Sequence, residues 1–226
     1  DALERADSIA QRMDASWASA RVQEWKAELM IARNDTDAIP YCSDLVKERA
    51  ASNVKDRCRS FLVLGEAYNA AARFPQADTA FAQALALARE TKSVHLLRDV
   101  ALDHTANLTT LGRMREAIPL ALSAIGDTSA STFSDTQVRL MSNLGSAYFN
   151  LSRIDSSFFW HGLALRNAPI LKDTAAWIGA ISNLTNLMTM QADFQGAMAH
   201  LQQGRLLAHE AGLAEREAKM CYNIAA

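Results

Sequence analysis

The residues that could carry out catalysis are scattered along this chain of 226 residues. Asp99 and Asp103 lie one helical turn apart, and paired carboxylates can hold a metal ion or act in acid–base catalysis. Solvated acidic helix faces show the same pattern far more often. The five histidines and three cysteines fall at spacings that match no metal or nucleophile motif. HExxH, GxSxG, CxxC and glycine-rich phosphate loops are missing, so the sequence predicts a non-enzymatic protein without catalytic residues, cofactors or metal site.

The histidines and cysteines have plainer explanations as core residues. Cys42, Cys58 and Cys221 are an odd number of thiols and are interpreted as buried small hydrophobes. A reducing compartment is slightly favoured over a periplasmic one, which stays open. His104 has no second ligand at helical spacing, so we expect a packed histidine there rather than a metal ligand.

Charge and hydropathy exclude two classes of partner. The net charge is −2, the isoelectric point is about 6.2, and lysine and arginine form no block. Nucleic-acid binding needs a concentrated basic surface, so none is expected from this segment. No apolar stretch approaches the length that spans a bilayer, so no membrane span is expected. The chain begins at Asp1 without a signal-like segment, which suggests an excised or processed fragment.

The strongest pattern is a repeat of about forty residues. FLVLGEAYNAAARFPQADTAFAQAL begins at Phe61 and MSNLGSAYFNLSRIDSSFFWHGLAL begins at Met141. Both contain Leu-Gly, a Tyr three residues later, and Ala-Leu near the end. Equivalent positions, 39 and then 40 residues apart, are Trp25, Leu64, His104, Leu144, Leu184 and Ile224. With the residues four further on (Leu29, Tyr68, Leu108, Tyr148 and Met188), they predict one inward helical face per repeat.

Each repeat is predicted to be a pair of helices. Half of the residues are apolar and only four are proline, a composition that favours helix, and no alternating β-branched run predicts a strand. A turn follows each first helix, and small residues near the start of the second allow close approach: Ala38, Ala77, Ala117, Ser157 and Ala197. Pro75 fits a first helical turn, whereas Pro40 and Pro119 fall about one turn into their helices.

This pattern resembles the tetratricopeptide repeat (TPR) family, in its subclass with a period of about 40. The match is strongest around Gly65 and Gly145 and weakest around Arg33. The resemblance implies an all-α, right-handed solenoid of antiparallel helix hairpins without β-sheet. The expected organisation is one solenoid segment over residues 1–226. It comprises a second helix of a preceding repeat (1–14), five repeats (18–56, 57–96, 97–136, 137–176 and 177–216) and the start of another (217–226).

The resemblance also implies a binding groove on the first helices. In this family the residue before the packing Leu points into a concave groove. Here those residues include a row of asparagines at intervals of 40, preceded by Asp103. An amide offers both a donor and an acceptor for a peptide backbone, and kinesin light chains and bacterial pheromone-receptor regulators use groove asparagines this way. The groove residues implied are Asn143, Asn183, Asn223 and Asp103, with Arg59, Arg139, Ser142, Asn150, Ser182 and Asn186 one turn either side.

Alternatives stay open for each of these groups. The asparagines could instead bond neighbouring helices and stabilise stacking, because buried polar groups need partners. Arg139 could bind a ligand carboxylate or form a surface ion pair of little value. The aromatic run 158–161 cannot face one side of a helix, so at least one ring should be exposed or should contact an adjacent repeat.

Two functional hypotheses follow. The first is a non-enzymatic scaffold that binds a protein or peptide partner in its concave groove. The second is a sensory or regulatory module of a larger bacterial signalling or transcription-regulatory protein. The sequence leaves the oligomeric state unknown.

Overall fold

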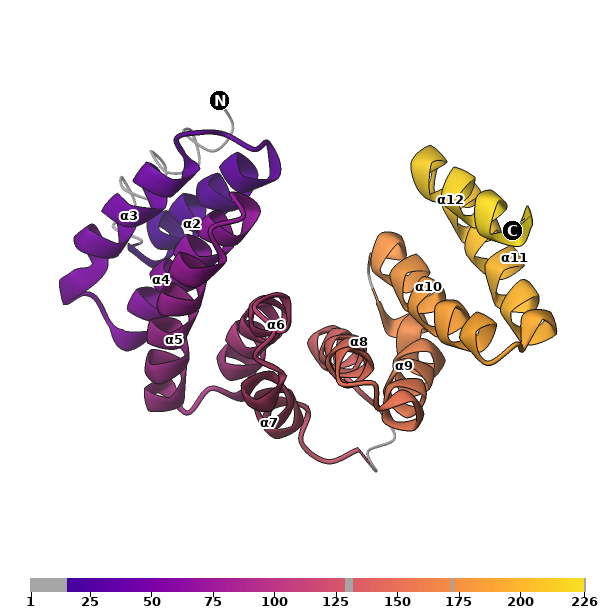
Figure 1. Ribbon diagram of the computed structural model, residues 1–226. Coiled ribbons are helices and arrows are strands. Elements are labelled where there is room, and N and C mark those ends of the chain that lie inside the picture. Colours follow the sequence, from indigo (N-terminus) through magenta and orange to yellow (C-terminus); the bar gives the residue numbers. More distant parts are fainter. Residues whose placement is uncertain (1–15, 129–131, 172, 226) are drawn as a thin grey trace. The chain divides into compact units, whose positions relative to one another are not determined.

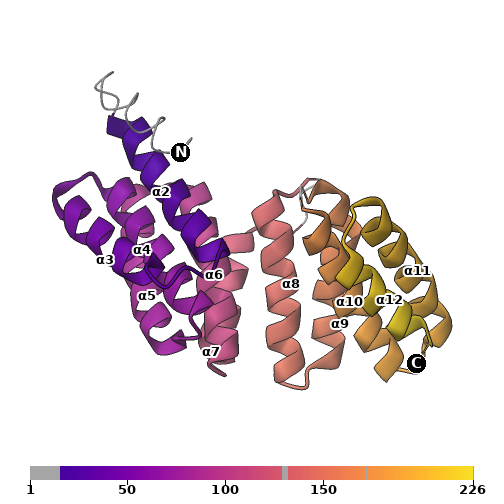
Figure 2. The ribbon, with the colours of Figure 1, turned by 90° about the horizontal axis from the view of Figure 1, so that it is seen from above.

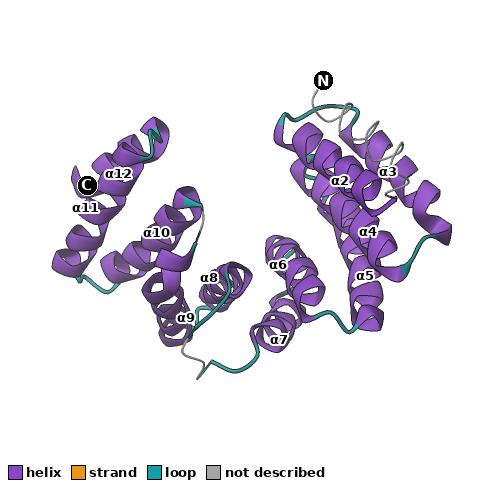
Figure 3. Ribbon diagram, turned by 180° about the vertical axis from the view of Figure 1, so that it is seen from behind, coloured by secondary structure: helices purple, strands orange, loops and turns teal. Residues whose placement is uncertain are grey.

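The computed structural model of this chain describes residues 16–128, 132–171 and 173–225. These residues form eleven α-helices and two short 3₁₀ helices, with no β-strand among them (Figure 3). The all-α prediction is therefore confirmed for the described ranges. The helix expected over residues 1–14 lies outside them. The chain divides into two compact units, Asp1–Leu111 and Gly112–Ala226, which are described one at a time.

Unit 1 contains two helical hairpins and one further helix, α6. Its helices are α2 (Ser16–Ala32), α3 (Ala38–Glu48), the 3₁₀ helix η1 (Arg49–Ala51), α4 (Val54–Ala70), α5 (Phe74–Thr91) and α6 (Val94–Thr110) (Figure 1). The first helices contact one another in sequence, α2 with α4 and α4 with α6, while α5 packs against both α4 and α6. This layering leaves one face of the unit lined by first helices alone.

Unit 2 has the same plan with one half-repeat at each end. Its helices are α7 (Met114–Ile125), α8 (Asp135–Asn150), α9 (Ile154–Asn167), the 3₁₀ helix η2 (Ala168–Ile170), α10 (Thr174–Met190), α11 (Phe194–Glu210) and α12 (Ala214–Ala225) (Figure 1). Helix α8 pairs with α9 and α10 with α11, and α10 also contacts α8 and α9. The first helix expected over 217–226 corresponds to α12.

Local chemistry sets the helix boundaries. Each turn between the two helices of a hairpin contains one residue with a left-handed backbone, at positive φ. These residues are Asn34, Ala72, Gly112, Ser152 and Ala192, at intervals of 38, 40, 40 and 40 residues. The first helices begin at side-chain caps, with Asn53 accepting from the Asp56 backbone and Ser134 forming a capping box with Gln137. A period of 40 is therefore visible in the backbone from Ala72 to Ala192.

The small residues predicted for the second helices are all buried. In the hairpins α4–α5 and α8–α9 the first helix adds a glycine of its own. A Cβ on Gly65 would lie 2.5 Å from two ring carbons of Phe81. The same relation joins Gly145 to His161, where a Cβ would lie 2.8 Å from the imidazole ring. His161 thus occupies the position that Phe81 occupies two repeats earlier.

The inward face predicted for the first repeat is wrong. Trp25 is 47% exposed and Leu29 is 37% exposed, whereas Glu24 and Ala27 are buried. The turn residues Asn34 and Ala72 are 38 residues apart, not the 39 assumed for Trp25. The slip aligns Trp25 with Val63, which is itself buried, so the register alone does not place Trp25 outside. The buried ion pair of Glu24 with Arg49, at 2.8 Å, turns the Glu24 side of α2 inward. Trp25 lies at the surface, where the Arg21 guanidinium covers its ring at 5.2 Å.

The prediction that all three cysteines are buried is wrong for one of them. Cys42 and Cys58 are buried, but Cys221 on α12 is exposed. Burial raises the pKa of the Cys42 and Cys58 thiols to about 12. Both are therefore unreactive core residues, as expected.

His161 is a buried histidine that packs like an aromatic side chain. It is 3% exposed and its Nδ1 has no hydrogen-bond partner within the described residues. Burial lowers the pKa of His161 to about 4, from an ordinary value of 6.5. The ring is therefore neutral in the folded protein at neutral pH.

We expect His161 to make the protein less stable as the pH falls from about 6.5 to about 4. In that window the unfolded chain binds a proton that the folded chain does not, so the folded state loses about 1.4 kcal/mol per pH unit. His161→Phe should remove this loss. The measurement is urea unfolding of both proteins at pH 6.5 and pH 4.5. We expect the difference in free energy of unfolding between the two proteins to change by about 2 kcal/mol from one pH to the other. Parallel pH profiles would contradict the assignment.

Candidate functional site

The described part of unit 1 has a cavity of about 430 Å³ on its first-helix face. Its lining residues come from three successive first helices, α2, α4 and α6, and none comes from α3 or α5. Figure 2 shows the ribbon of these helices from above. The lining is Arg21, Glu24 and Glu28 from α2; Arg59, Leu62, Val63 and Glu66 from α4; and Leu96, Asp99, Leu102 and Asp103 from α6. We call it the unit 1 cavity. It combines leucine and valine walls with five carboxylates and two guanidinium groups.

The two arginines of the unit 1 cavity are directed at the glutamates of α2. Arg21 Nη1 lies 2.8 Å from Glu24 Oε2 and 3.7 Å from Glu28 Oε1. Arg59 Nη1 lies 3.7 Å from the same Glu24 oxygen. Glu24 is 1% exposed and also bonds Arg49 Nη1, which is not part of the lining, at 2.8 Å. The positive charge of the cavity is therefore concentrated at its α2 side.

Glu66, unlike Glu24 and Glu28, has no arginine within ion-pair distance among the described residues. It is half-buried, and no hydrogen bond or ion pair joins its side chain to another described residue. Burial raises the pKa of Glu66 to about 8, the negative charges of Asp103, Glu28 and Asp99 add to the rise, and Arg21 opposes it. Burial also raises the pKa of Glu28. At pH 7 the Glu66 carboxyl is therefore mostly protonated.

The sequence anticipated part of this cavity. Asp103 and Arg59, predicted from the groove register, both line it, and so does Asp99 of the carboxylate pair. Glu66 and Glu28 were missed. The spacing of the acidic residues was a usable signal. Glu24 and Glu28 lie four residues apart on one face of α2, and Asp99 and Asp103 have the same spacing on α6. Glu66 has no such partner on α4, so only the packing of α4 between α2 and α6 brings it there.

The predicted asparagines lie on the first helices of unit 2. Asn183 Nδ2 donates to Ser142 Oγ at 3.1 Å, which joins α10 to α8. This bond is the stacking contact that was the alternative explanation for the asparagine row. Asn143 is half-buried and has a polar contact of its own. Asn223 on α12 is half-buried, whereas Asn150 and Asn186 are exposed.

Two further predicted groove residues are engaged within the chain. Arg139 Nε donates to Asp135 Oδ2 at 2.8 Å, and its guanidinium also lies 3.5 Å from Asp173 Oδ2. Ser182 Oγ donates to the Ile178 carbonyl, one turn earlier on α10. A ligand carboxylate at Arg139 would have to compete with two internal ones.

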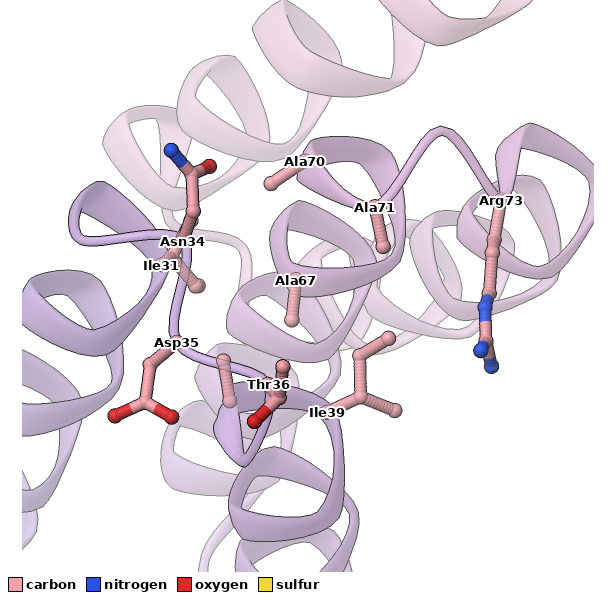
Figure 4. Close-up of a pocket in the computed structure, with 10 residues that line it drawn as sticks. Ile31, Asn34, Asp35, Thr36, Ile39, Ala67, Ala70, Ala71 and Arg73 are labelled. Carbon is pink, nitrogen blue, oxygen red and sulfur yellow. The ribbon is translucent and has the colours of Figure 1, made fainter.

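A second cavity of unit 1, of about 300 Å³, lies at the turn end of the hairpins. Asn34, Asp35 and Thr36 of the α2–α3 turn line one part of it, and Ala67, Ala70 and Ala71 of the last turn of α4 line another (Figure 4). Alanines dominate the α4 part of the lining. Its polar groups are Asn34, Asp35, Thr36 and Arg73, and the alanine part of the lining offers no side-chain donor or acceptor.

Unit 2 has a cavity of about 340 Å³ beside the aromatic run of α9. Phe158, Phe159, Gly162, Arg166, Asp155 and Gln191 line it. Phe159 is 53% exposed, and its ring meets the edge of the buried Trp160 at 5.2 Å. The expectation that at least one ring of this run is exposed is therefore confirmed.

His104 is a packed core residue, as expected. It is buried, its Nε2 lies 2.9 Å from Asp78 Oδ1 on α5, and its ring lies 5.9 Å from that of Phe81. Within the described residues, no cluster of three or more His, Cys, Asp or Glu side chains is arranged to hold a metal ion. None of the described helices is both long and apolar enough to cross a membrane.

Comparison with known proteins identifies the fold. No model of a known protein family matches the sequence, and no curated protein matches it significantly. Among solved structures, BtubC from P. vanneervenii is 18% identical with a TM-score of 0.74, over 93% of this chain and 90% of that one. The TPR-like repeats of a Podosopora anserina protein named for kinesin light chain are 16% identical with a TM-score of 0.65, over 84% and 95%.

A third match is a chain from the structure of a protein assembly. The APC/C hetero-tetramer Cut9–Hcn1 is 16% identical with a TM-score of 0.66, over 99% of this chain and 40% of that one. Identities this low establish the fold and nothing finer. The chain has the all-α helical-repeat fold of tetratricopeptide-repeat proteins.

Proposed function

We propose that this chain is a non-enzymatic scaffold that binds a segment of a partner protein along the first-helix faces of its hairpins. The observation that carries this proposal is the unit 1 cavity, which three successive first helices line. A surface built this way is longer than one helix is wide, so it fits an extended or helical segment.

The chemistry of the first-helix faces supports the proposal. The unit 1 cavity offers apolar walls at Leu62 and Val63 beside charged groups, the mixture found in sites that recognise ligands. In unit 2, Asn143, Asn183 and Asn223 offer amides on first helices, although Asn183 already spends one donor on Ser142. The Cut9–Hcn1 structure shows the same fold within an assembly of two different proteins.

The test is a selection of random twelve-residue peptides displayed on phage against the purified protein. Recovered peptides would be labelled and titrated by fluorescence anisotropy. Leu62→Trp fills the unit 1 cavity and should weaken binding at least tenfold for peptides that occupy it. Gln83→Trp places the same side chain on the exposed face of α5 and serves as the matched control. Its affinity should equal that of the unchanged protein.

Unit 2 needs its own arm of the experiment. Asn143→Ala combined with Asn183→Ala should weaken peptides that bind its first helices, and circular dichroism would verify that the helices persist. If no recovered peptide responds to either the tryptophan or the double alanine variant, the scaffold proposal is refuted.

A further inference from the structure

We propose that α9 of unit 2 pairs with α9 of a second copy of this chain, antiparallel and about a two-fold axis. The contact surface is a line of four residues that we call the α9 stripe: Asp155, Phe159, Gly162 and Arg166. It lies on the second helix of a hairpin and is separate from the first-helix faces of the proposed function. Its exposure, its unpaired charges and its symmetry carry the proposal.

The α9 stripe occupies one face of the helix, turned away from the core of unit 2. Its residues are four, three and four positions apart, the spacing that keeps side chains on one side of a helix. All four line the same cavity of about 340 Å³. The buried residues of α9 fall on the opposite face: Ser157, Trp160, His161 and Ala164. No other described helix therefore covers the stripe.

The middle of the stripe combines an exposed ring with a gap. Phe159 is 53% exposed, and its edge-to-face contact with Trp160 at 5.2 Å holds the ring in place. Gly162 follows one turn later, where an added Cβ would meet no atom within 4 Å. Covering an aromatic ring is among the larger sources of binding energy at protein interfaces. The gap over Gly162 offers the space for such a ring.

The two ends of the stripe have opposite charges without partners. Asp155 lies in the first turn of α9 and Arg166 in its last turn, and both side chains are exposed. Neither makes an ion pair or a side-chain hydrogen bond with a described residue. Eleven residues of helix separate them by about 16 Å, which is too far for them to pair with each other.

The symmetry of the stripe selects a second copy as its occupant. In an antiparallel helix pair about a two-fold axis, residues equally far before and after the axis along the sequence meet each other. Asp155 and Arg166 are equally far from the point midway between Trp160 and His161, and so are Phe159 and Gly162. A single register therefore places each carboxylate opposite a guanidinium group and each ring opposite a gap.

The first test is sedimentation velocity of the full chain over a range of concentrations. One helix of 14 residues from each copy makes a small interface, so we expect weak, concentration-dependent dimers. Asp155→Arg and Arg166→Asp each place like charges opposite one another at both ends of the pair. Each variant alone should weaken association by about tenfold or more.

Mixing the two charge variants supplies the rescue. In an equimolar mixture of Asp155→Arg and Arg166→Asp, one copy of each has opposite charges facing at both ends. The mixture should therefore associate about as strongly as the unchanged protein. Damage to the fold would not be repaired by mixing, so this result separates a direct contact from a structural effect.

The gap has its own variant and matched control. Gly162→Gln places a side chain where the ring of Phe159 from the second copy would lie, and should weaken association by about tenfold or more. Gly179→Gln makes the same change inside α10, where a Cβ also meets no atom within 4 Å, and should leave association unchanged. Circular dichroism would verify that both variants keep their helices.

Two results would overturn the pairing. A chain that stays monomeric at every concentration shows that the α9 stripe has a different occupant or none. A dimer that is indifferent to both charge reversals and to Gly162→Gln uses another surface. Neither result bears on the scaffold proposal, because its variants Leu62→Trp and Asn143→Ala with Asn183→Ala lie on first helices.

Discussion

Arg49→Met is expected to lower the free energy of unfolding by about 3 kcal/mol, because it leaves a buried carboxylate without its main partner. Glu24 is 1% exposed and Arg49 is 5% exposed, and their closest atoms, Oε1 and Nη1, lie 2.8 Å apart. Arg49 Nη2 also donates to the Ala20 carbonyl at 2.6 Å and to Gln23 Oε1 at 3.1 Å. The loss falls at the lower end of the range for broken buried pairs because Arg21 still contacts Glu24.

The measurement is urea unfolding followed by circular dichroism, with two comparison variants. Lys47→Met breaks the ion pair with Asp44. The Lys47 side chain is 76% exposed and that of Asp44 is 65% exposed, so the free energy of unfolding should fall by less than about 1 kcal/mol. Glu24→Leu with Arg49→Met removes both buried charges and should recover at least half of the loss, because no unpaired charge remains. Equal effects of Arg49→Met and Lys47→Met would contradict the buried ion pair.

Gly65→Ala is expected to lower the free energy of unfolding by about 1–3 kcal/mol, the usual cost of overpacking a core. The added Cβ would lie 2.5 Å from two carbons of the Phe81 ring, and that ring is fully buried. The ring therefore cannot move away without disturbing α4 or α5. Elsewhere in a helix, alanine in place of glycine stabilises by about 1 kcal/mol, so the predicted sign opposes helix propensity.

Gly179→Ala is the matched control. Gly179 lies inside α10, and a Cβ there would meet no atom within 4 Å. This variant should be more stable than the unchanged protein, by up to about 1 kcal/mol. Thermal unfolding of both variants measures the contrast. If Gly65→Ala also raised the melting temperature, the close packing of Phe81 on α4 would be wrong.

The alternation of helices could be predicted from the sequence because it depends on local chemistry. The Leu-Gly pair at Leu64 and Gly65 recurs at Leu144 and Gly145, and both glycines are covered by a ring from the second helix. That register specifies a hairpin without knowledge of distant contacts. The resemblance to tetratricopeptide repeats followed from the same positions, and the matched structures have that fold.

The first repeat shows where this reasoning stops. The repeat register placed Trp25 in the core, but Trp25 is 47% exposed and the adjacent Glu24 is buried. Hydropathy reinforced the error, since tryptophan and leucine are ordinary core residues while glutamate is not. Glu24 is buried because Arg49, 25 residues later, reaches it. No local sequence pattern predicts a partner 25 residues away.

The candidate sites divide in the same way. Asp103 and Arg59 were predicted from the groove register and lie in the unit 1 cavity. The asparagine row was also predicted from register, and whether it binds a partner stays a prediction, because Asn183 bonds Ser142 across two helices. A register specifies which face a residue occupies, but it does not specify which neighbour is within hydrogen-bond distance.

The sequence by itself determined the helices, their turns and the small residues near the start of the second helices, because a side chain's place on a helix follows from its number along the chain. Only the tertiary structure decided which charges are neutralised. It brings Arg49 to Glu24 and leaves Glu66 half-buried without a hydrogen-bond or ion-pair partner among the described residues. The physical reason is that electrostatic energy depends on distances and burial between helices, and those are set when the hairpins pack.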